Sequence, residues 1–203
     1  LSDVKPLHNT FGLENPRLVS PGDPYSSVLL YRLSTLGAGR MPRINAITAI
    51  DTSALDLLHE WITRVGPDGK LVDSPQDSLS ETEKKTLQRL QNAAGDSATE
   101  IYQDAIDLLL ASPRGAMILA RAVADGSLSS EVSDVAINSA LQQTDSRVRD
   151  LFERFVPPEK RTKRLGESID PTALLAIDGD AEDGRESFLR GVGAQCKGCH
   201  RIF

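Results

Sequence analysis

Short apolar stripes at helical spacing follow one another along residues 77–156, and they constrain the fold more than any other feature of the sequence. Each stripe begins after a residue that caps helices and ends near Gly or Pro. Ser80 and Glu83 have the spacing of a capping box, and Pro113 both ends one stripe and begins the next. Short helices joined by tight loops pack antiparallel. The sequence therefore predicts an array of helical hairpins over 77–156.

Capping residues and apolar stripes indicate where the helices of this array lie in the sequence. One stripe comprises Ile101, Ala105, Leu108 and Leu109. Later helices are expected after Ser129 or Ser130 and after Asp145. Before the array, Pro24 follows a capping Asp and predicts the first residue of a short helix. A second helix is expected from about residue 51 to Gly66, where a polar, turn-rich boundary begins.

The end of the chain is expected to contain a linker and one more helix. Residues 157–170 are basic and contain prolines, as is typical of a linker. Asp180 is expected to cap a final helix that extends to about Gly191. No convincing period-two alternation of β-branched residues occurs in the sequence, so the whole chain is predicted to be all-α.

Composition excludes several classes of protein. Hydrophobic residues make up 39% and charged residues 26%, which is close to the globular average and excludes global disorder. The net charge is −6, so we expect neither a nucleic-acid groove nor a surface for anionic lipids. No apolar run reaches the roughly 18 residues that a membrane-spanning helix needs. We therefore expect no membrane span in this segment.

The only two cysteines lie three residues apart, and a histidine follows the second one directly. Cys196, Cys199 and His200 have the order and spacing required for covalent attachment of c-type haem. The two thiols bond the vinyl groups of the porphyrin, and the imidazole reaches the iron. Such thiols have to be handled outside the reducing cytosol. The motif therefore predicts bound haem c and a periplasmic or otherwise extracytoplasmic location.

Three alternatives to haem attachment remain open for this motif. A thioredoxin-like redox pair needs a preceding β-strand, whereas the segment before Cys196 has the pattern of a helix followed by a loop. A zinc site needs four ligands, and only His8 and His59, both distant in sequence, are left to complete one. The two cysteines could also be structural.

Residues 179–203 resemble the opening of a class I cytochrome c domain. The resemblance rests on a capped first helix, on Gly184 and Phe188 four residues apart on its packing face, and on the attachment motif. It implies that Gly184, which has no Cβ, lets the last helix of the domain approach the first one closely.

Residues 19–65 resemble the back half of a bacterial cytochrome c-like domain. The segment containing Arg40 and Met41 before a proline, followed by a closing helix around Trp61, carries this resemblance. It implies that Met41 is the second axial ligand of an upstream haem; the alternative is an exposed loop methionine. Arg40 could pair with a haem propionate or be an ordinary solvated arginine. His8 and His59 could each ligate a haem or be surface or packing residues.

The helical middle resembles the HEAT-like spacers that precede a terminal cytochrome domain in large bacterial dehydrogenase-type proteins. Because a back half comes first and a front half last, we expect a fragment of a longer multidomain protein. Its expected parts are the end of one cytochrome c-like domain (1–66), a helical spacer (77–156) and the start of a second cytochrome c domain (170–203). Met41 could also complete the coordination of the haem at His200 if the two halves docked on each other.

These patterns predict a module that binds haem c covalently and transfers electrons to or from a redox partner protein or domain. The expected partners are a dehydrogenase, as the electron donor, and a respiratory acceptor. The alternative is a haem-free helical domain that offers a groove over 77–156 to a protein partner. The sequence contains no nucleophile elbow, phosphate loop or zinc-protease helix, so nothing in this segment indicates catalysis. The parent protein could still oxidise a sugar or an alcohol through another domain.

Overall fold

The structure is a computed structural model, and it describes residues 4–7, 9–41, 50–93, 99–162 and 171–190. The chain divides into two compact units, Leu1–Thr162 and Lys163–Phe203. The predicted segments 1–66 and 77–156 thus lie within one unit, and 170–203 lies in the other.

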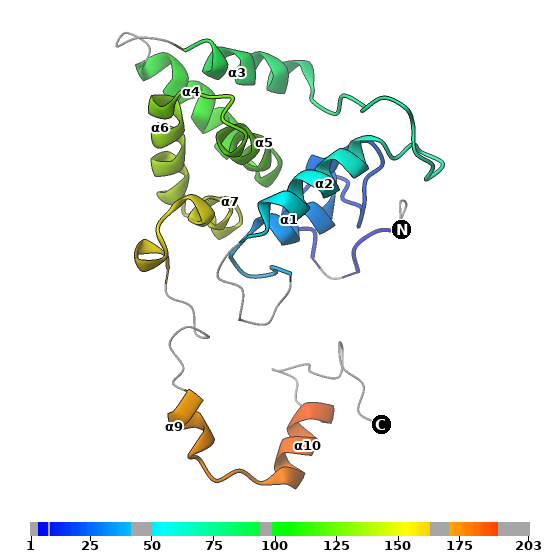
Figure 1. The fold of residues 1–203 in the computed structure, drawn as a ribbon, viewed down its shortest axis with the longest axis vertical. Coiled ribbons are helices and arrows are strands. Elements are labelled where there is room, and N and C mark those ends of the chain that lie inside the picture. Colours follow the sequence, from blue (N-terminus) through cyan, green and yellow to red (C-terminus); the bar gives the residue numbers. More distant parts are fainter. Residues whose placement is uncertain (1–3, 8, 42–49, 94–98, 163–170, 191–203) are drawn as a thin grey trace. The chain divides into compact units, whose positions relative to one another are not determined.

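The described part of the chain is helical, which confirms the predicted all-α class (Figure 1). Within it the backbone forms no strand, only two isolated bridges, Arg17 with Ser27 and Val65 with Leu71. None of the helices described combines the length and the apolar character needed to cross a membrane. The elements of the first unit are η1 (Pro24–Ser26), α1 (Val28–Ser34), α2 (Thr52–Thr63), α3 (Glu81–Gln91), α4 (Thr99–Leu110), α5 (Pro113–Ala124), α6 (Ser130–Leu141), α7 (Ser146–Phe152), η3 (Glu153–Phe155) and η4 (Pro158–Lys160).

Most helix starts are where the capping residues predicted them. The capping box of α3 is complete: the Glu83 backbone N–H donates to Ser80 Oγ at 3.2 Å, and the Ser80 N–H donates to Glu83 Oε2 at 2.7 Å. Ser129 is the N-cap of α6, with its Oγ accepting from the Val132 N–H at 3.3 Å. Asp145 caps α7 in the same way. These local hydrogen bonds satisfy backbone donors that a helix leaves free at its start.

The helix expected from Pro24 is interrupted after one turn. Asp23 caps a short 3-10 turn, and α1 begins only at Val28 because Ser27 has an extended backbone. The Ser27 hydroxyl holds this break in place: it donates to the Asp23 carbonyl at 2.9 Å and accepts from the Ser20 N–H at 2.8 Å. A tertiary bond to the preceding loop therefore overrides the local preference for one continuous helix.

The core of the first unit forms where α4 and α5 pack between α3, α6 and α7. Ile106, Leu119 and Phe152 are fully buried there. The apolar stripe predicted for α4 is wrong at Leu108, which is 54% exposed. Leu110, two positions further on, is buried instead. Neighbouring helices cover a wider face of α4 than the single stripe indicated, and Leu108 lies outside this face.

The first 66 residues pack against the helical array through specific contacts. The Tyr31 hydroxyl on α1 donates to the Arg147 carbonyl on α7 at 3.0 Å, and the Leu36 N–H donates to the Asp150 carbonyl at 3.3 Å. Phe11 stacks on Tyr31 with a ring separation of 4.9 Å. Burial of these two aromatic rings joins the segment to the array in one unit.

The second unit contains α9 (Pro171–Leu175) and α10 (Ala181–Arg190). Asp180 caps α10 as predicted, because its Oδ1 accepts from the backbone N–H of Glu182 at 2.8 Å and of Asp183 at 2.9 Å. No residue of α10 is buried.

Candidate functional site

The predicted haem-attachment residues Cys196, Cys199 and His200 lie outside the described residues. The structure describes the helix that precedes them. α10 ends at Arg190, so residues 191–195 separate it from the first cysteine.

One face of α10 carries apolar side chains that have little cover. Phe188 and Leu189 are half-buried, and Gly184 is exposed. A Cβ built on Gly184 would meet no other atom within 4 Å. Because Gly184 and Phe188 are four residues apart, they lie on the same side of the helix. This side of α10 is therefore open at Gly184 and partly covered at Phe188.

Met41 lies in a loop that is fixed to α1. Its backbone N–H donates to the Arg32 carbonyl at 2.8 Å, and Arg32 Nε donates to the Gly39 carbonyl at 2.7 Å. Met41 is 38% exposed, so this methionine is available at the surface of the first unit. Arg40 is half-buried, and its backbone N–H donates to the Gly37 carbonyl at 3.3 Å.

A large cavity lies beside the loop that carries Met41. Its volume is about 670 Å³, and the residues that line it include Phe11, Tyr31, Arg32, Gly39 and Arg147. Gly39 has a φ of +91°, and a Cβ there would overlap the Phe11 ring, so the turn requires glycine. Burial, followed by the charges of Asp150 and Asp145, raises the pKa of Tyr31. The cavity therefore combines a stacked aromatic wall with cationic side chains.

His59 is held by a neighbouring aromatic residue. Its Nε2 lies 3.1 Å from the Tyr25 hydroxyl, and the two rings meet edge to face at 5.4 Å. Burial and then the positive charge of Arg121 lower the pKa of His59 below its ordinary value. His59 is therefore a packing residue in this structure; His8 lies outside the described residues.

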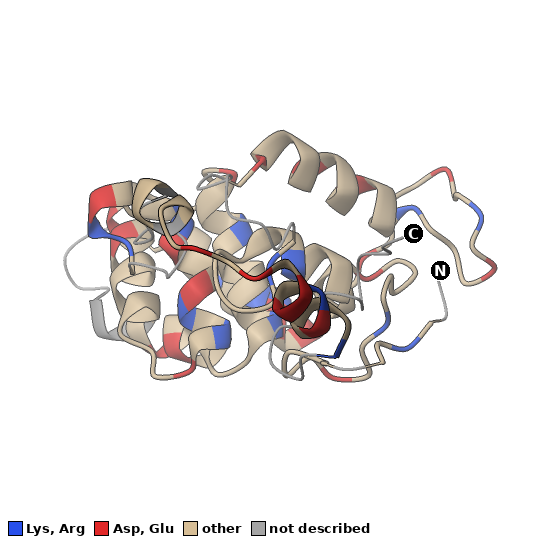
Figure 2. Ribbon diagram, turned by 90° about the horizontal axis from the view of Figure 1, so that it is seen from below, with Lys and Arg blue, Asp and Glu red and all other residues tan. Residues whose placement is uncertain are grey.

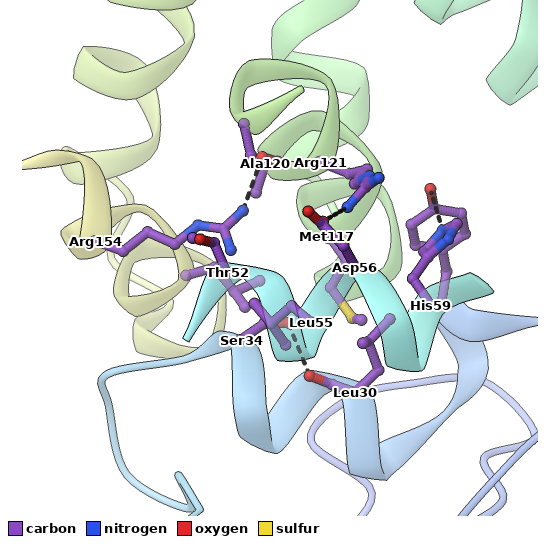
Figure 3. Close-up of a pocket in the computed structure, with 13 residues that line it drawn as sticks. Leu30, Ser34, Thr52, Leu55, Asp56, His59, Met117, Ala120, Arg121 and Arg154 are labelled. Atoms are coloured by element: carbon purple, nitrogen blue, oxygen red, sulfur yellow. Dashed lines mark hydrogen bonds and ion pairs between the residues drawn. The ribbon is translucent and has the colours of Figure 1, made fainter. Parts of the chain in front are cut away.

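A smaller cavity adjoins His59 and brings together two arginines that the sequence patterns did not single out (Figure 3). Arg121 on α5 forms an ion pair with Asp56 on α2. Arg154 in η3 donates from Nη2 to the Ala120 carbonyl at 2.9 Å. The only sequence signal was the presence of charged residues within otherwise apolar helical stripes.

The described residues contain no group of three or more His, Cys, Asp or Glu side chains placed to hold a metal ion. Acidic and basic residues both occur along the helices of this part of the chain (Figure 2). No family model, curated protein or solved structure matches the chain.

Proposed function

We propose that this chain binds haem c covalently at Cys196, Cys199 and His200 and transfers electrons as part of an exported multidomain cytochrome. The motif of two thiols and an adjacent histidine carries this proposal, because its donor set has the chemistry that haem c attachment needs. Bound haem supplies one-electron transfer. In the proposal, Cys196 and Cys199 would hold the porphyrin through their sulfur atoms, and His200 would be a ligand of the iron.

The features of α10 support this assignment. A capped helix with an apolar side, separated from the first cysteine by five residues, resembles the opening of a class I cytochrome c domain. The space around Gly184 provides room for another helix to approach the α10 backbone. We infer that another helix of the same domain packs on Gly184 and Phe188.

Met41 is proposed as an axial ligand of a second haem, attached through an upstream part of the same protein. The two hydrogen bonds that join its loop to Arg32 support this role, because a ligand must be held in position. A thioether ligand raises the reduction potential of haem iron, which suits an electron acceptor.

The helices of 77–156 are proposed to be a HEAT-like spacer between the two redox domains. The hydrogen bond from Tyr31 to the Arg147 carbonyl and the stacking of Phe11 on Tyr31 support a fixed attachment of the first segment to this spacer. The protein would then serve a dehydrogenase partner or domain outside the cytosol.

Haem attachment is tested by exporting the chain together with a c-type haem maturation system. The wild type should acquire a stain for covalent haem, and the double variant Cys196→Ser, Cys199→Ser should lose it. Met41→Leu serves as a matched control for this site, since it should leave the attachment unchanged. A colourless wild type whose two thiols titrate freely would instead support the haem-free interaction domain.

A further inference from the structure

The cavity beside His59 lies among α1, α2, α5 and the end of α7 (Figure 3). One side of it is apolar and consists of Leu30, Leu55, Met117 and Leu151. Thr52 and Asp56 also line the cavity and are exposed, so it meets solvent at the outer side of α2. The cavity therefore has an apolar interior and a polar opening.

One of the two arginines at this cavity has no carboxylate partner among the described residues. Arg121 forms ion pairs with Asp56 and with Asp125, whereas the hydrogen bond of Arg154 goes to a backbone carbonyl. His59 adds little positive charge at neutral pH, because burial and Arg121 lower its pKa. The Arg154 guanidinium is thus a partly buried charge without a carboxylate of its own, which favours a singly charged anion beside it.

Arg154 is the arginine without a carboxylate partner. Its Nη2 donates to a neutral carbonyl, that of Ala120, and its guanidinium lies 4.7 Å from the Phe155 ring centre. Arg154 Nε is buried without a hydrogen-bond partner, and no carboxylate among the described residues forms an ion pair with it. Burial and the charge of Arg121 lower the pKa of Arg154 to about 10. A guanidinium has five N–H donors, so Arg154 retains donors for an anion.

The size of the cavity limits the anion to a few atoms. The open volume of the cavity is about 40 Å³, and one water molecule needs roughly 10–15 Å³ of such volume. Three or four small groups therefore fit, which corresponds to a carboxylate with a short alkyl chain. A planar carboxylate also matches the donor fork of arginine.

We propose that this cavity binds a short-chain monocarboxylate. The carboxylate accepts hydrogen bonds from Arg154 beside Arg121, and the alkyl end contacts Leu55 and Met117. The proposal rests on residues of the first unit alone and is independent of haem attachment.

Acetate is the probe for this site. It is titrated into the complete 203-residue chain at constant ionic strength, with chloride as the replaced anion, while NMR follows the Nε–Hε signals of the arginines. The Arg154 signal, identified by its loss in Arg154→Lys, should shift saturably with acetate and should not shift with chloride. A shift that does not saturate, or that occurs equally with chloride, would overturn the proposal.

Two variants and a second anion complete the test. Arg154→Lys keeps the charge but loses the fork, so acetate affinity, measured by calorimetry, should fall roughly tenfold or more. Ala124→Val keeps both arginines, reduces the space at the cavity and should also weaken binding. Arg190→Lys, on exposed α10, should bind acetate as the wild type does. Unchanged affinity in both cavity variants, or tighter binding of inorganic phosphate than of acetate, would contradict a monocarboxylate site.

Discussion

Replacing Arg114 by Gln should destabilise the whole first unit, in which the first segment of the chain packs on the helical array. Arg114 at the start of α5 donates from Nη1 to both carboxylate oxygens of Asp23, at 2.9 and 2.7 Å, and from Nε to Glu83 Oε1 at 2.8 Å. Its Nη2 also donates to the Ser78 carbonyl at 2.7 Å. The Arg114 guanidinium therefore connects α5 to the start of η1, to the segment before α3 and to the first turn of α3.

The expected loss of stability follows from the burial of this cluster. The side chains of Arg114, Asp23 and Glu83 are 21%, 27% and 17% exposed. Removing the guanidinium leaves two carboxylates with little access to water, although each keeps one backbone hydrogen bond. We expect Arg114→Gln to lower the free energy of unfolding by about 3 kcal/mol, between the cost of an exposed and of a fully buried ion pair.

Arg114→Gln should also change how the free energy of unfolding depends on pH in acid. Burial opposes ionisation of Glu83, but the hydrogen bonds from Arg114 and Ser80 outweigh it and lower the pKa of Glu83 below its ordinary 4.5. This contribution to stability is present above the ordinary pKa and is lost as the pH falls through the folded pKa. Arg114→Gln should therefore reduce the loss of stability in acid.

Urea unfolding at neutral pH measures the effect with two probes. Trp61, the single tryptophan, reports on the first segment by fluorescence, and circular dichroism reports mainly on the array. Both midpoints should fall together in Arg114→Gln, and the exposed control Lys70→Gln should leave them unchanged. A loss below about 0.5 kcal/mol, or a shift of the fluorescence midpoint alone, would refute this account of the cluster.

Two further changes have defined outcomes. Gly115→Ala should destabilise the first unit by about 1–3 kcal/mol in urea unfolding, because the Cβ of the new alanine would overlap the backbone carbonyl of Leu109. A variant as stable as the wild type would show that α4 and α5 can separate without cost. Protonation of His59 should destabilise the fold as the pH falls from its ordinary pKa of 6.5 through its lowered folded pKa, since the unfolded chain takes up the proton first. His59→Gln should lose less stability than the wild type between pH 7.5 and pH 5; equal losses would contradict this sign.

The sequence was most informative where structure is decided locally. The caps at Ser80, Ser129, Asp145 and Asp180 involve residues two or three positions apart, so their patterns predicted the helix starts. The break before α1 was not predictable, because the Ser27 hydroxyl bonds to a loop seven residues away.

Long-range contacts account for what the sequence could not predict. Arg114 meets partners 91 and 31 residues away, and no local pattern connects them. Arg121 and Arg154 are likewise distant in sequence and share a cavity only after α5 and α7 have packed. The proposed attachment motif is the reverse case, because its prediction rests on the spacing of Cys196, Cys199 and His200 in the sequence alone.

Intact-mass measurement of the exported chain tests the proposed electron carrier most directly. After maturation with a haem attachment system, the denatured protein should be heavier by the mass of one haem. The variant Cys196→Ser, Cys199→Ser should have the mass of the polypeptide alone. A matured wild-type chain with no added mass and two free thiols would contradict covalent haem binding at this site.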